Sequence, residues 1–245
     1  MISPVLTGIA AGLGAAGLLY GGCAYAALWP TSQIFGPTLV APNNPDEIAL
    51  TFDDGPNPTW TPILLKHLAR RNVHATFFLV GSYAAREPNL VREIISAGHS
   101  VGNHSWRHPN LAFSTEAKIR LELVRSRSVL EEVTNQPVRL FRPPFGARRP
   151  AVLKIARSLG MVPVLWNAMT TDWSTPEATL IADRLTKKID HNRQHGHASN
   201  VVLHDGNHMD PKADRGPSVA AAKLLLARYK DRCRFVRIDE WCEAK

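Results

Sequence analysis

Short apolar runs alternate with amphipathic segments from residue 46 to the end of the chain. The apolar runs indicate buried strands and end near Phe52, Val80, Asn103, Phe141, Ala168, Leu203 and Ile238. The amphipathic segments predict helices, most with proline in the first turn: from Pro62, Pro88 to Gly98, Thr115 to Val133, Pro150 to Leu159, Pro176 to Ile189 and Pro217 to Lys230. About seven such repeats favour a parallel α/β fold, a distorted (β/α)7-type closed barrel; an open doubly wound sheet is the alternative.

Polar residues gather at or just after the ends of the predicted strands. The clusters are Asp53-Asp54, His104 to His108, Arg142 to Gly146, Asp172-Trp173 and His204-Asp205. The carboxyl ends of the strands in a parallel barrel share one rim, where active sites lie. Residues far apart in the sequence are therefore expected to meet in one cleft.

The first 29 residues differ from the rest of the chain. Val5 to Trp29 has no charged side chain, and a helix of that length, at about 1.5 Å per residue, exceeds the roughly 30 Å hydrocarbon core of a membrane. We expect residues 1–29 to be an uncleaved transmembrane anchor; a signal peptide cleaved at Ala24-Tyr25-Ala26 is the alternative. Residues 30–45 are expected to be a linker and 46–245 the folded domain.

Charge is confined to the expected domain. The 245 residues carry a formal net charge of +8, and no charged side chain precedes Asp46. A basic domain favours anionic surroundings such as a membrane or a cell-wall polymer. The sequence has no dense Lys/Arg tract and no nucleic-acid motif, so nucleic acid is not an expected partner. Cys233 and Cys242 would pair in an exported domain or remain thiols.

Two motifs contain candidate metal ligands. TFDDGP places two aspartates side by side after the first strand, and adjacent carboxylates need a cation, a metal or a proton to offset their repulsion. His104 and His108 in HSWRH are four residues apart, and on one helical turn this spacing would put both imidazoles on one face. Two His and one Asp leave coordination positions open, which is typical of a catalytic metal site.

Five motifs follow one another in order: TFDDGP, HSWRH, RPPFG, DW and LHDG. They resemble the five motifs of carbohydrate esterase family 4, the polysaccharide deacetylases with a NodB-homology domain, and cover about residues 46–241. The resemblance implies an enzyme, a polysaccharide N-deacetylase. It also implies that Asp54, His104 and His108 bind a divalent metal ion, Zn²⁺ first, with Co²⁺, Ni²⁺ or Mn²⁺ as alternatives.

The same resemblance implies the roles of five further residues. Asp53 would be the catalytic base, taking a proton from the water that attacks an acetamide carbonyl, and Arg142 would pair with it. The backbone N–H of Phe145 would stabilise the oxyanion. His204 would be the general acid that protonates the departing amine, with Asp172 orienting its ring.

The walls of the substrate pocket are less strongly specified. Trp173 and Leu203 are implied to line the pocket for the acetyl methyl, with core packing as the alternative. Family members often carry an aspartate three residues before the DW motif, where this chain has Met169, so we expect one polar contact near the sugar to be absent. Three histidines are expected to be solvated in a loop on the opposite rim: His191, His195 and His197. The roles of His208 and Asp210 remain open.

These features predict a membrane-anchored, metal-dependent hydrolase that removes N-acetyl groups from amino sugars of a cell-envelope polysaccharide, with its catalytic domain outside the cytoplasm. A secreted or periplasmic domain follows if the first segment is cleaved. Peptidoglycan is the first expected substrate, because a tethered basic enzyme would stay close to that anionic layer. A chitooligosaccharide or a lipid-linked sugar, deacetylated or deformylated, is the alternative. A non-catalytic carbohydrate-binding protein of the same fold is disfavoured, because the implied base, ligands and acid are all present.

Overall fold

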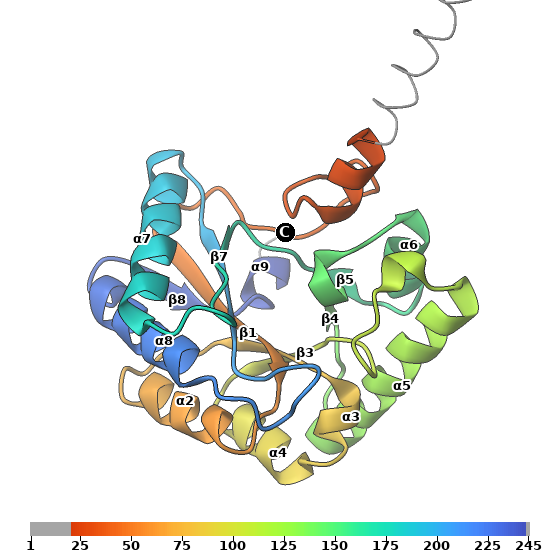
Figure 1. The fold of residues 1–245 in the computed structure, drawn as a ribbon, viewed down its shortest axis with the longest axis horizontal. Coiled ribbons are helices and arrows are strands. Elements are labelled where there is room, and N and C mark those ends of the chain that lie inside the picture. Colours follow the sequence, from red (N-terminus) through yellow and green to blue (C-terminus); the bar gives the residue numbers. More distant parts are fainter. Residues whose placement is uncertain (1–20, 244–245) are drawn as a thin grey trace, which may run out of the picture.

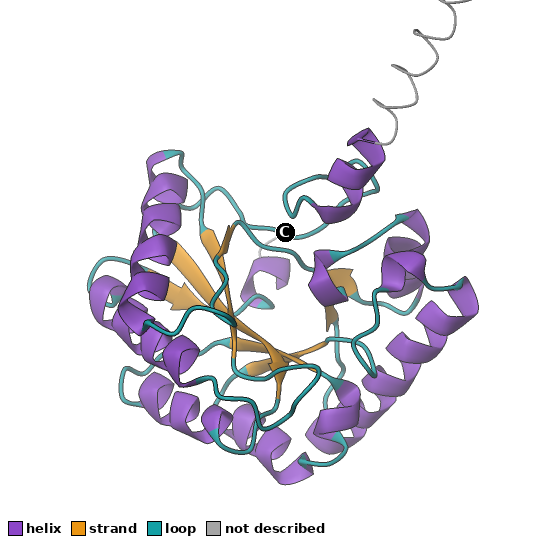
Figure 2. Cartoon of the chain, viewed as in Figure 1, coloured by secondary structure: helices purple, strands orange, loops and turns teal. Residues whose placement is uncertain are grey.

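A curved parallel sheet surrounded by helices forms the centre of the computed structural model, which describes residues 21–243 (Figures 1 and 2). Its strands are β1 (Glu47–Gly55), β2 (Thr76–Leu79), β3 (Ser100–Asn103), β4 (Leu140–Phe141), β5 (Val162–Pro163), β6 (Ala168–Met169), β7 (Ser199–His204) and β8 (Arg234–Val236). Its helices are α2 (Trp60–Ala69), α3 (Gly81–Ala84), α4 (Pro88–Ser96), α5 (Glu116–Thr134), α6 (Pro150–Ser158), α7 (Ala178–Gln194), α8 (Gly216–Tyr229) and α9 (Glu240–Glu243), with short 3-10 turns η1 (Leu111–Phe113) and η2 (Pro144–Gly146).

The sheet confirms the α/β class but not the closed barrel. Its strand order is β5-β4-β3-β2-β1-β7-β6, and β8 pairs with the start of β1. Every paired strand is parallel. Within residues 21–243 no ladder joins the outermost strands, β5 and β6, so the barrel is curled but open. Both strands are two residues long, which leaves little backbone to pair across the gap.

Part of the expected linker packs on the open side of the barrel. The N–H of Leu39 donates to the carbonyl of Pro163 at 2.9 Å, and the N–H of Leu165 donates to the carbonyl of Leu39 at 2.8 Å. The carbonyl of Val40 accepts from the side chain of Asn200 on β7 at 3.0 Å. This segment therefore extends the β5 edge and contacts β7 instead of only connecting two parts of the chain.

Alternation along β1 separates the outer core from the interior of the barrel. Three side chains point outward into the large core beneath the helices: Ile48, Leu50 and Phe52. Ala49 points inward and packs in a smaller cluster with Trp241 of α9. Thr51 and Asp53 share the inward face with Ala49, so the interior is apolar at one end and polar at the other. Cys233 lies in the outer core as a free thiol. Of the two alternatives given for this residue, a disulfide or a thiol, the structure has the thiol.

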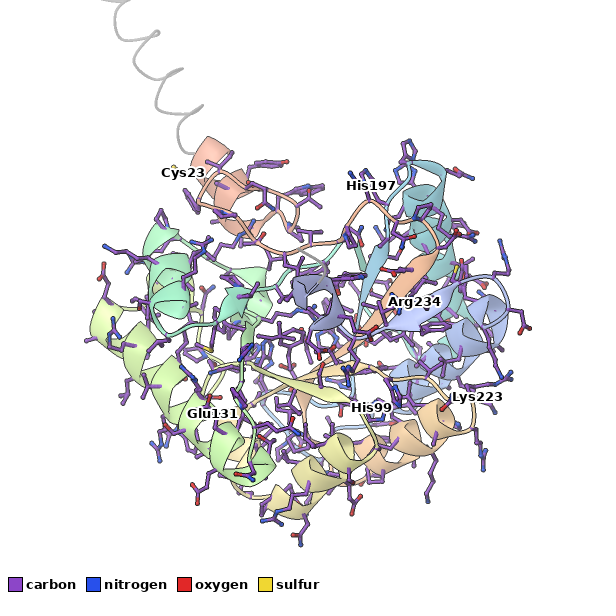
Figure 3. All side chains as sticks on the ribbon, turned by 180° about the vertical axis from the view of Figure 1, so that it is seen from behind. Cys23, His99, Glu131, His197, Lys223 and Arg234 are labelled. Atoms are coloured by element: carbon purple, nitrogen blue, oxygen red, sulfur yellow. The ribbon has the colours of Figure 1, made fainter. Side chains whose placement is uncertain are left out.

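The helices begin close to the expected prolines, but one ends later than expected. α4 and α6 start at Pro88 and Pro150. α7 continues beyond Ile189 to Gln194, and in the added turn the buried Asn192 side chain donates to Ser199 Oγ at 3.1 Å. His191 consequently lies on a helix and not in a loop. The three histidines of this region are exposed as expected, and Figure 3 shows His197 at the periphery of the molecule.

The segment before the domain is fixed to the barrel by a buried arginine. Residues 21–28 form a helix, and Arg148, 1% exposed, donates to the carbonyls of Ala27, Trp29 and Ser32 at 3.2, 2.7 and 3.0 Å. The greater part of the expected anchor, residues 1–20, lies outside the described residues. Over residues 21–243, none of the helices has the length and apolar character needed to cross a membrane.

A buried histidine makes the stability of the domain depend on pH. The Nδ1 atom of His99, which is labelled in Figure 3, accepts from the N–H of Ala75 at 3.1 Å. Burial, together with the charges of His74 and Arg237, lowers the pKa of His99 to about 4. The folded protein therefore binds fewer protons than the unfolded chain between the ordinary pKa of 6.5 and about 4.

His99→Asn should consequently be less sensitive to acid than the wild type. The wild type should lose about 3 kcal/mol of unfolding free energy relative to the variant as the pH falls from about 7 to about 4, because His99 must gain a proton in a site that disfavours it. An asparagine can still accept from Ala75 but does not titrate. Denaturant unfolding at several pH values measures the difference, and parallel stability curves for the two proteins would contradict the prediction.

Candidate active site

A cavity of about 490 Å³ opens at the carboxyl ends of the strands. Residues from all five motifs line it: Asp53, Asp54, His104, His108, Pro143, Phe145, Gly146, Trp173 and His204. The expectation that distant strand ends meet in one cleft is thus confirmed. Arg142 and Asp172 lie behind the wall, where each contacts a residue that does line the cavity.

Asp53 is held by a fully buried arginine. Arg142 Nη1 donates to Asp53 Oδ1 at 2.8 Å and to Thr51 Oγ1 at 2.7 Å, and Arg142 Nη2 donates to Asn200 Oδ1 at 3.2 Å. The guanidinium also lies over the Phe78 ring at 4.1 Å. The second oxygen of Asp53, Oδ2, lies 3.9 Å from His104 Nε2. Arg142 therefore fixes one carboxylate oxygen while the other remains directed toward the histidines.

Asp54 faces a different set of partners from its neighbour. Its Oδ1 lies 3.1 Å from His108 Nε2 and 3.5 Å from His104 Nε2, and its Oδ2 lies 3.5 Å from His208 Nδ1. Burial alone would raise the pKa of Asp54, but the contacts with His104 and His208 and the charge of His108 hold that pKa well below its ordinary value. The two adjacent aspartates are thus separated into an arginine-bound and a histidine-bound carboxylate.

The HSWRH segment is a loop, so the expected helical turn is wrong. Side chains take the backbone N–H groups that a helix would satisfy. Asn103 accepts from Ser105 at 2.8 Å, and Ser105 in turn accepts from His108 at 2.9 Å. Glu122, buried on α5, accepts from the two intervening N–H groups at 3.0 and 2.8 Å. These contacts bend the chain so that both imidazoles of the motif still reach Asp54.

Left-handed backbone is concentrated at this site. Four residues other than glycine have positive φ there: Asp54 at 69°, Ser105 at 63°, His108 at 58° and Phe145 at 58°. Such conformations are costly for L-residues and persist where the surrounding structure imposes them, often at functional sites. In Asp54 the left-handed turn coincides with the register shift between β1 and β2, which directs its side chain away from that of Asp53.

Asp54, His104 and His108 fit a divalent metal ion. Their ligand atoms lie within 4.8 Å of one another, and all three residues are buried. His104 Nδ1 contacts the carbonyl of Arg142 at 2.8 Å, which assigns the proton to Nδ1 and leaves the Nε2 lone pair for a ligand bond. Burial lowers the pKa of His108 to about 2, so the ring is in the neutral form that binds metals. Asp54 Oδ1 has no aligned hydrogen-bond donor among the described residues, despite the nearby imidazoles.

His204 and Asp172 form a second pair at the cavity. Asp172 Oδ1 lies 2.9 Å from His204 Nδ1, while its Oδ2 accepts from the His204 N–H at 2.8 Å and from Ser218 Oγ at 2.7 Å. Burial disfavours the charged ring, but the Asp172 carboxylate, with smaller contributions from Asp54 and Asp53, raises the pKa of His204 to about 9. His204 is therefore protonated at neutral pH and can donate from Nε2.

The cavity wall differs from the implied one at one position. Trp173 and Phe145 line the cavity with 45% and 52% of their surface exposed. Leu203 does not reach it, because its register with Phe52 on β1 places it on the outer face of the sheet, in the large core. The β7 residues on either side of it, Val202 and His204, line the cavity instead. Met169, three residues before the DW motif, also lines the cavity.

A buried carboxyl group lies against the aspartate turn. Asp205 is fully buried, accepts from the Thr61 hydroxyl, and has its pKa raised by burial to about 7. A Cβ atom at Gly55 would lie 2.7 Å from this carboxylate, and one at Gly206 would lie 2.0 Å from the carbonyl of Asp54. The two glycines therefore allow the turn and the following loop to approach each other closely.

Several positioning residues were missed in the sequence. Thr51 lies two positions before Asp53 and Asn200 four before His204, so strand alternation could have identified both as inward-facing. Glu122 and Ser218 come from helices and carry no local signal. His208, whose role was open, stacks on His108 with ring centroids 4.2 Å apart and lines the cavity.

Comparison with known proteins identifies related sequences across most of the chain. Residues 41–164, about half of the chain, match the family model described as polysaccharide deacetylase. A peptidoglycan-N-acetylglucosamine deacetylase of Bacillus cereus is 37% identical over 216 residues, which are 87% of this chain and 94% of that protein. A chitooligosaccharide deacetylase of Sinorhizobium fredii is 33% identical over 196 residues, 78% of this chain and 88% of that protein.

Solved structures show the same fold. The peptidoglycan N-acetylglucosamine deacetylase Bc1960 superimposes with a TM-score of 0.74 at 32% identity over 83% of this chain and 91% of that chain. The Bacillus anthracis protein BA3943, described as a pseudoenzyme of the CE4 family, superimposes with a TM-score of 0.74 at 28% identity over 83% of this chain and 68% of that chain. With the family model, the relatives and the fold in agreement, the chain belongs to the polysaccharide deacetylases of carbohydrate esterase family 4.

Proposed function

We propose that this protein is a metal-dependent N-deacetylase that removes acetyl groups from the amino sugars of peptidoglycan. The observation that carries the proposal is the pairing of opposite proton-transfer groups around one cavity. Asp53, held by Arg142, is available to accept a proton, and His204, held by Asp172, is available to donate one. The three residues that fit a divalent ion line the same cavity as Asp53 and His204.

Each residue contributes a distinct step to amide hydrolysis. Asp53 Oδ2 is the free carboxylate oxygen and takes the proton of the attacking water. His204 Nε2 donates a proton to the amine nitrogen as the carbon–nitrogen bond breaks, while Asp172 holds the ring through Nδ1. A divalent ion, when bound by Asp54, His104 and His108, would lower the pKa of water and polarise the acetyl carbonyl. The backbone N–H of Phe145 is the proposed oxyanion donor.

The fold by itself does not decide between an enzyme and a binding protein. The CE4 fold is shared with BA3943, a pseudoenzyme of which a mutant has restored activity. In the present chain the base, the acid, their two partners and the three metal-site residues are all in place, which supports catalysis.

Peptidoglycan is preferred to chitooligosaccharides on two grounds. Deacetylases of peptidoglycan are the most similar of the relatives described above, and the net charge of +8 suits an anionic polymer. The direct test is acetate release from peptidoglycan, chitooligosaccharides and acetylated xylan, each with and without a chelator. We expect the fastest chelator-sensitive release from peptidoglycan, and no release from any of them would overturn the proposed activity.

Zn²⁺ is the proposed metal, because two imidazoles and one carboxylate form a ligand set that zinc favours in catalytic sites. His108→Ala should lose most of its bound zinc and nearly all turnover, because only two protein ligands for the ion remain. We expect the variant to keep the fold. Elemental analysis of the purified variant, with circular dichroism as the control for folding, measures this. Full zinc occupancy in His108→Ala would count against the assignment.

Asp172→Asn should shift the alkaline limb of the pH–rate profile to lower pH. His204 must be protonated to act as an acid, and the Asp172 carboxylate raises its pKa, so losing that charge lets the ring lose its proton earlier. We expect the alkaline decline of kcat/KM to occur at a pH about one unit or more lower in the variant than in the wild type. A shift of this size is usual for the loss of one nearby opposite charge. An unmoved limb would show that His204 does not control it.

We further propose that the domain is held at the outer face of a membrane by its N-terminal segment. Tyr25, Leu28, Trp29 and Ile34 are 48 to 66% exposed beside the uncharged sequence that precedes them, and exposed Trp and Tyr suit the membrane–water interface. Fractionation of the full-length protein tests the proposal. Recovery of a wholly soluble protein starting at Tyr25 or later would establish cleavage instead.

A further inference from the structure

A second cavity, of about 430 Å³, adjoins the catalytic one. His208 stands in the wall of both. The other residues that line it are Val80, Ser82, Tyr83, Arg86 and Arg107. They come from the segment after β2 and from the HSWRH loop after β3, so this cavity lies on the same rim of the barrel as the active site.

The lining of this cavity favours an anion. It contains two guanidinium groups, a hydroxyl, a phenol and an imidazole, but no carboxylate. Among the ion pairs of residues 21–243, none involves Arg86 or Arg107. Glu122 contacts Arg107 only through the backbone N–H. Both arginines therefore have hydrogen-bond donors and charge available for a ligand.

The cavity is built on the loop that carries His208. Arg86 lies over the Tyr83 ring at 4.7 Å from its centroid. The Tyr83 hydroxyl donates to the carbonyls of Asn207 and His208 at 3.1 and 2.8 Å. This chain of contacts joins Arg86, which like Arg107 is exposed, to the shared wall, so the second cavity lies directly beside the catalytic one.

We propose that this cavity is a subsite for a carboxylate carried by the glycan, occupied while the N-acetyl group of a neighbouring sugar lies in the active site. The inference rests on the proposed function and deepens it, because it makes a carboxylate-bearing glycan a better substrate than a neutral one. Peptidoglycan strands without stem peptides carry such carboxylates on the lactyl ethers of alternate sugars, whereas an attached stem peptide converts the lactyl carboxyl to an amide. A neutral chitooligosaccharide of the same length would leave both arginines without a ligand.

The test compares matched substrates with matched variants. The probes are a peptide-free glycan of alternating N-acetylglucosamine and N-acetylmuramic acid and the same glycan with its carboxylates converted to carboxamides. Arg86→Gln/Arg107→Gln should reduce the preference for the acid over the amide, in kcat/KM, by roughly tenfold, the scale of one or two partly exposed charged hydrogen bonds. Arg86→Lys/Arg107→Lys should retain most of the preference, and added salt should weaken it.

The control is Arg70→Gln/Arg71→Gln, which removes the same charge from an exposed site at the end of α2, near the opposite rim. Its preference should equal that of the wild type. The subsite would be overturned if both Gln double variants had the same preference for the carboxylate glycan over the carboxamide glycan. It would also be overturned if Arg86→Gln/Arg107→Gln lost the same fraction of kcat/KM on both glycans. The same question can be decided without turnover by measuring the affinities of the two glycans for Asp53→Asn, with and without the Arg86→Gln/Arg107→Gln changes. Failure of the proposed activity would therefore appear separately, as absence of acetate release from every glycan by the wild type.

Discussion

Asp53→Asn should lower turnover by about 10²- to 10⁴-fold, the usual contribution of a positioned general base. The amide can still accept from Arg142, which donates to Asp53 Oδ1 at 2.8 Å in the wild type, so the buried guanidinium keeps a partner. The amide cannot take a proton from water at neutral pH. The three metal-site residues are unchanged, so zinc content should stay near that of the wild type. Acetate release and elemental analysis on the same preparation measure both quantities.

Asp205→Asn is the matched control for this prediction. It makes the same chemical change to another buried carboxyl group on the same rim, but Asp205 does not line the cavity. Because burial raises the pKa of Asp205 to about 7, its carboxyl is about half protonated at neutral pH, so exchanging it for an amide removes only part of a charge. We expect this variant to keep most of its activity. Comparable losses in both variants would show that the Asp53 effect arises from disturbed packing and not from proton transfer.

His204→Ala should lower kcat and kcat/KM together, by roughly 10²- to 10⁴-fold, with little change in KM. An amine leaves poorly as an anion, so the tetrahedral intermediate proceeds to product only when its nitrogen is protonated. In the structure the Asp172 carboxylate raises the pKa of His204 to about 9, which keeps that proton available at neutral pH. Steady-state kinetics on an acetylated amino sugar measures the loss.

Acetate esters separate a general acid from other roles of His204. An aryl oxygen with a low pKa departs without a proton, so His204→Ala should retain much more esterase than amidase activity. Zinc analysis serves as the control, because His204 is not one of the three proposed ligands. Equal losses on esters and amides would assign His204 to the oxyanion or the metal, and the general-acid role would have to be abandoned.

Strand ends and motif residues were predictable because they depend on local pattern. The apolar run before TFDDGP forms β1, and the alternation of its side chains places Asp53 on the inward face. The parallel arrangement of the strands then brings the motif residues to one rim. The same alternation, applied to β7, would have corrected one error: Leu203 pairs with Phe52 on the outer face, so it could not share the inward face with His204.

Features that depend on partners distant in the sequence could not be predicted. The four-residue spacing of His104 and His108 suggested a helix, but Glu122 on α5 takes two backbone N–H groups of the segment and stabilises a loop. The barrel remains open between β5 and β6, and residues near Leu39, which come from before β1, pair with the chain at the β5 edge.

The sequence by itself determined the family, the alternation of most of the strands and helices, and the residue types that meet at the rim, because apolar periodicity and short motifs are encoded locally. It did not indicate the short elements β5, α3 and α9. The tertiary structure decided how those residues are held. Arg142, directly after β4, reaches Asp53 and Thr51 on β1 and Asn200 on β7, and Ser218 on α8 completes the support of Asp172. Such contacts form only when the strands and helices pack, since a buried charge must find its partners wherever the fold brings them.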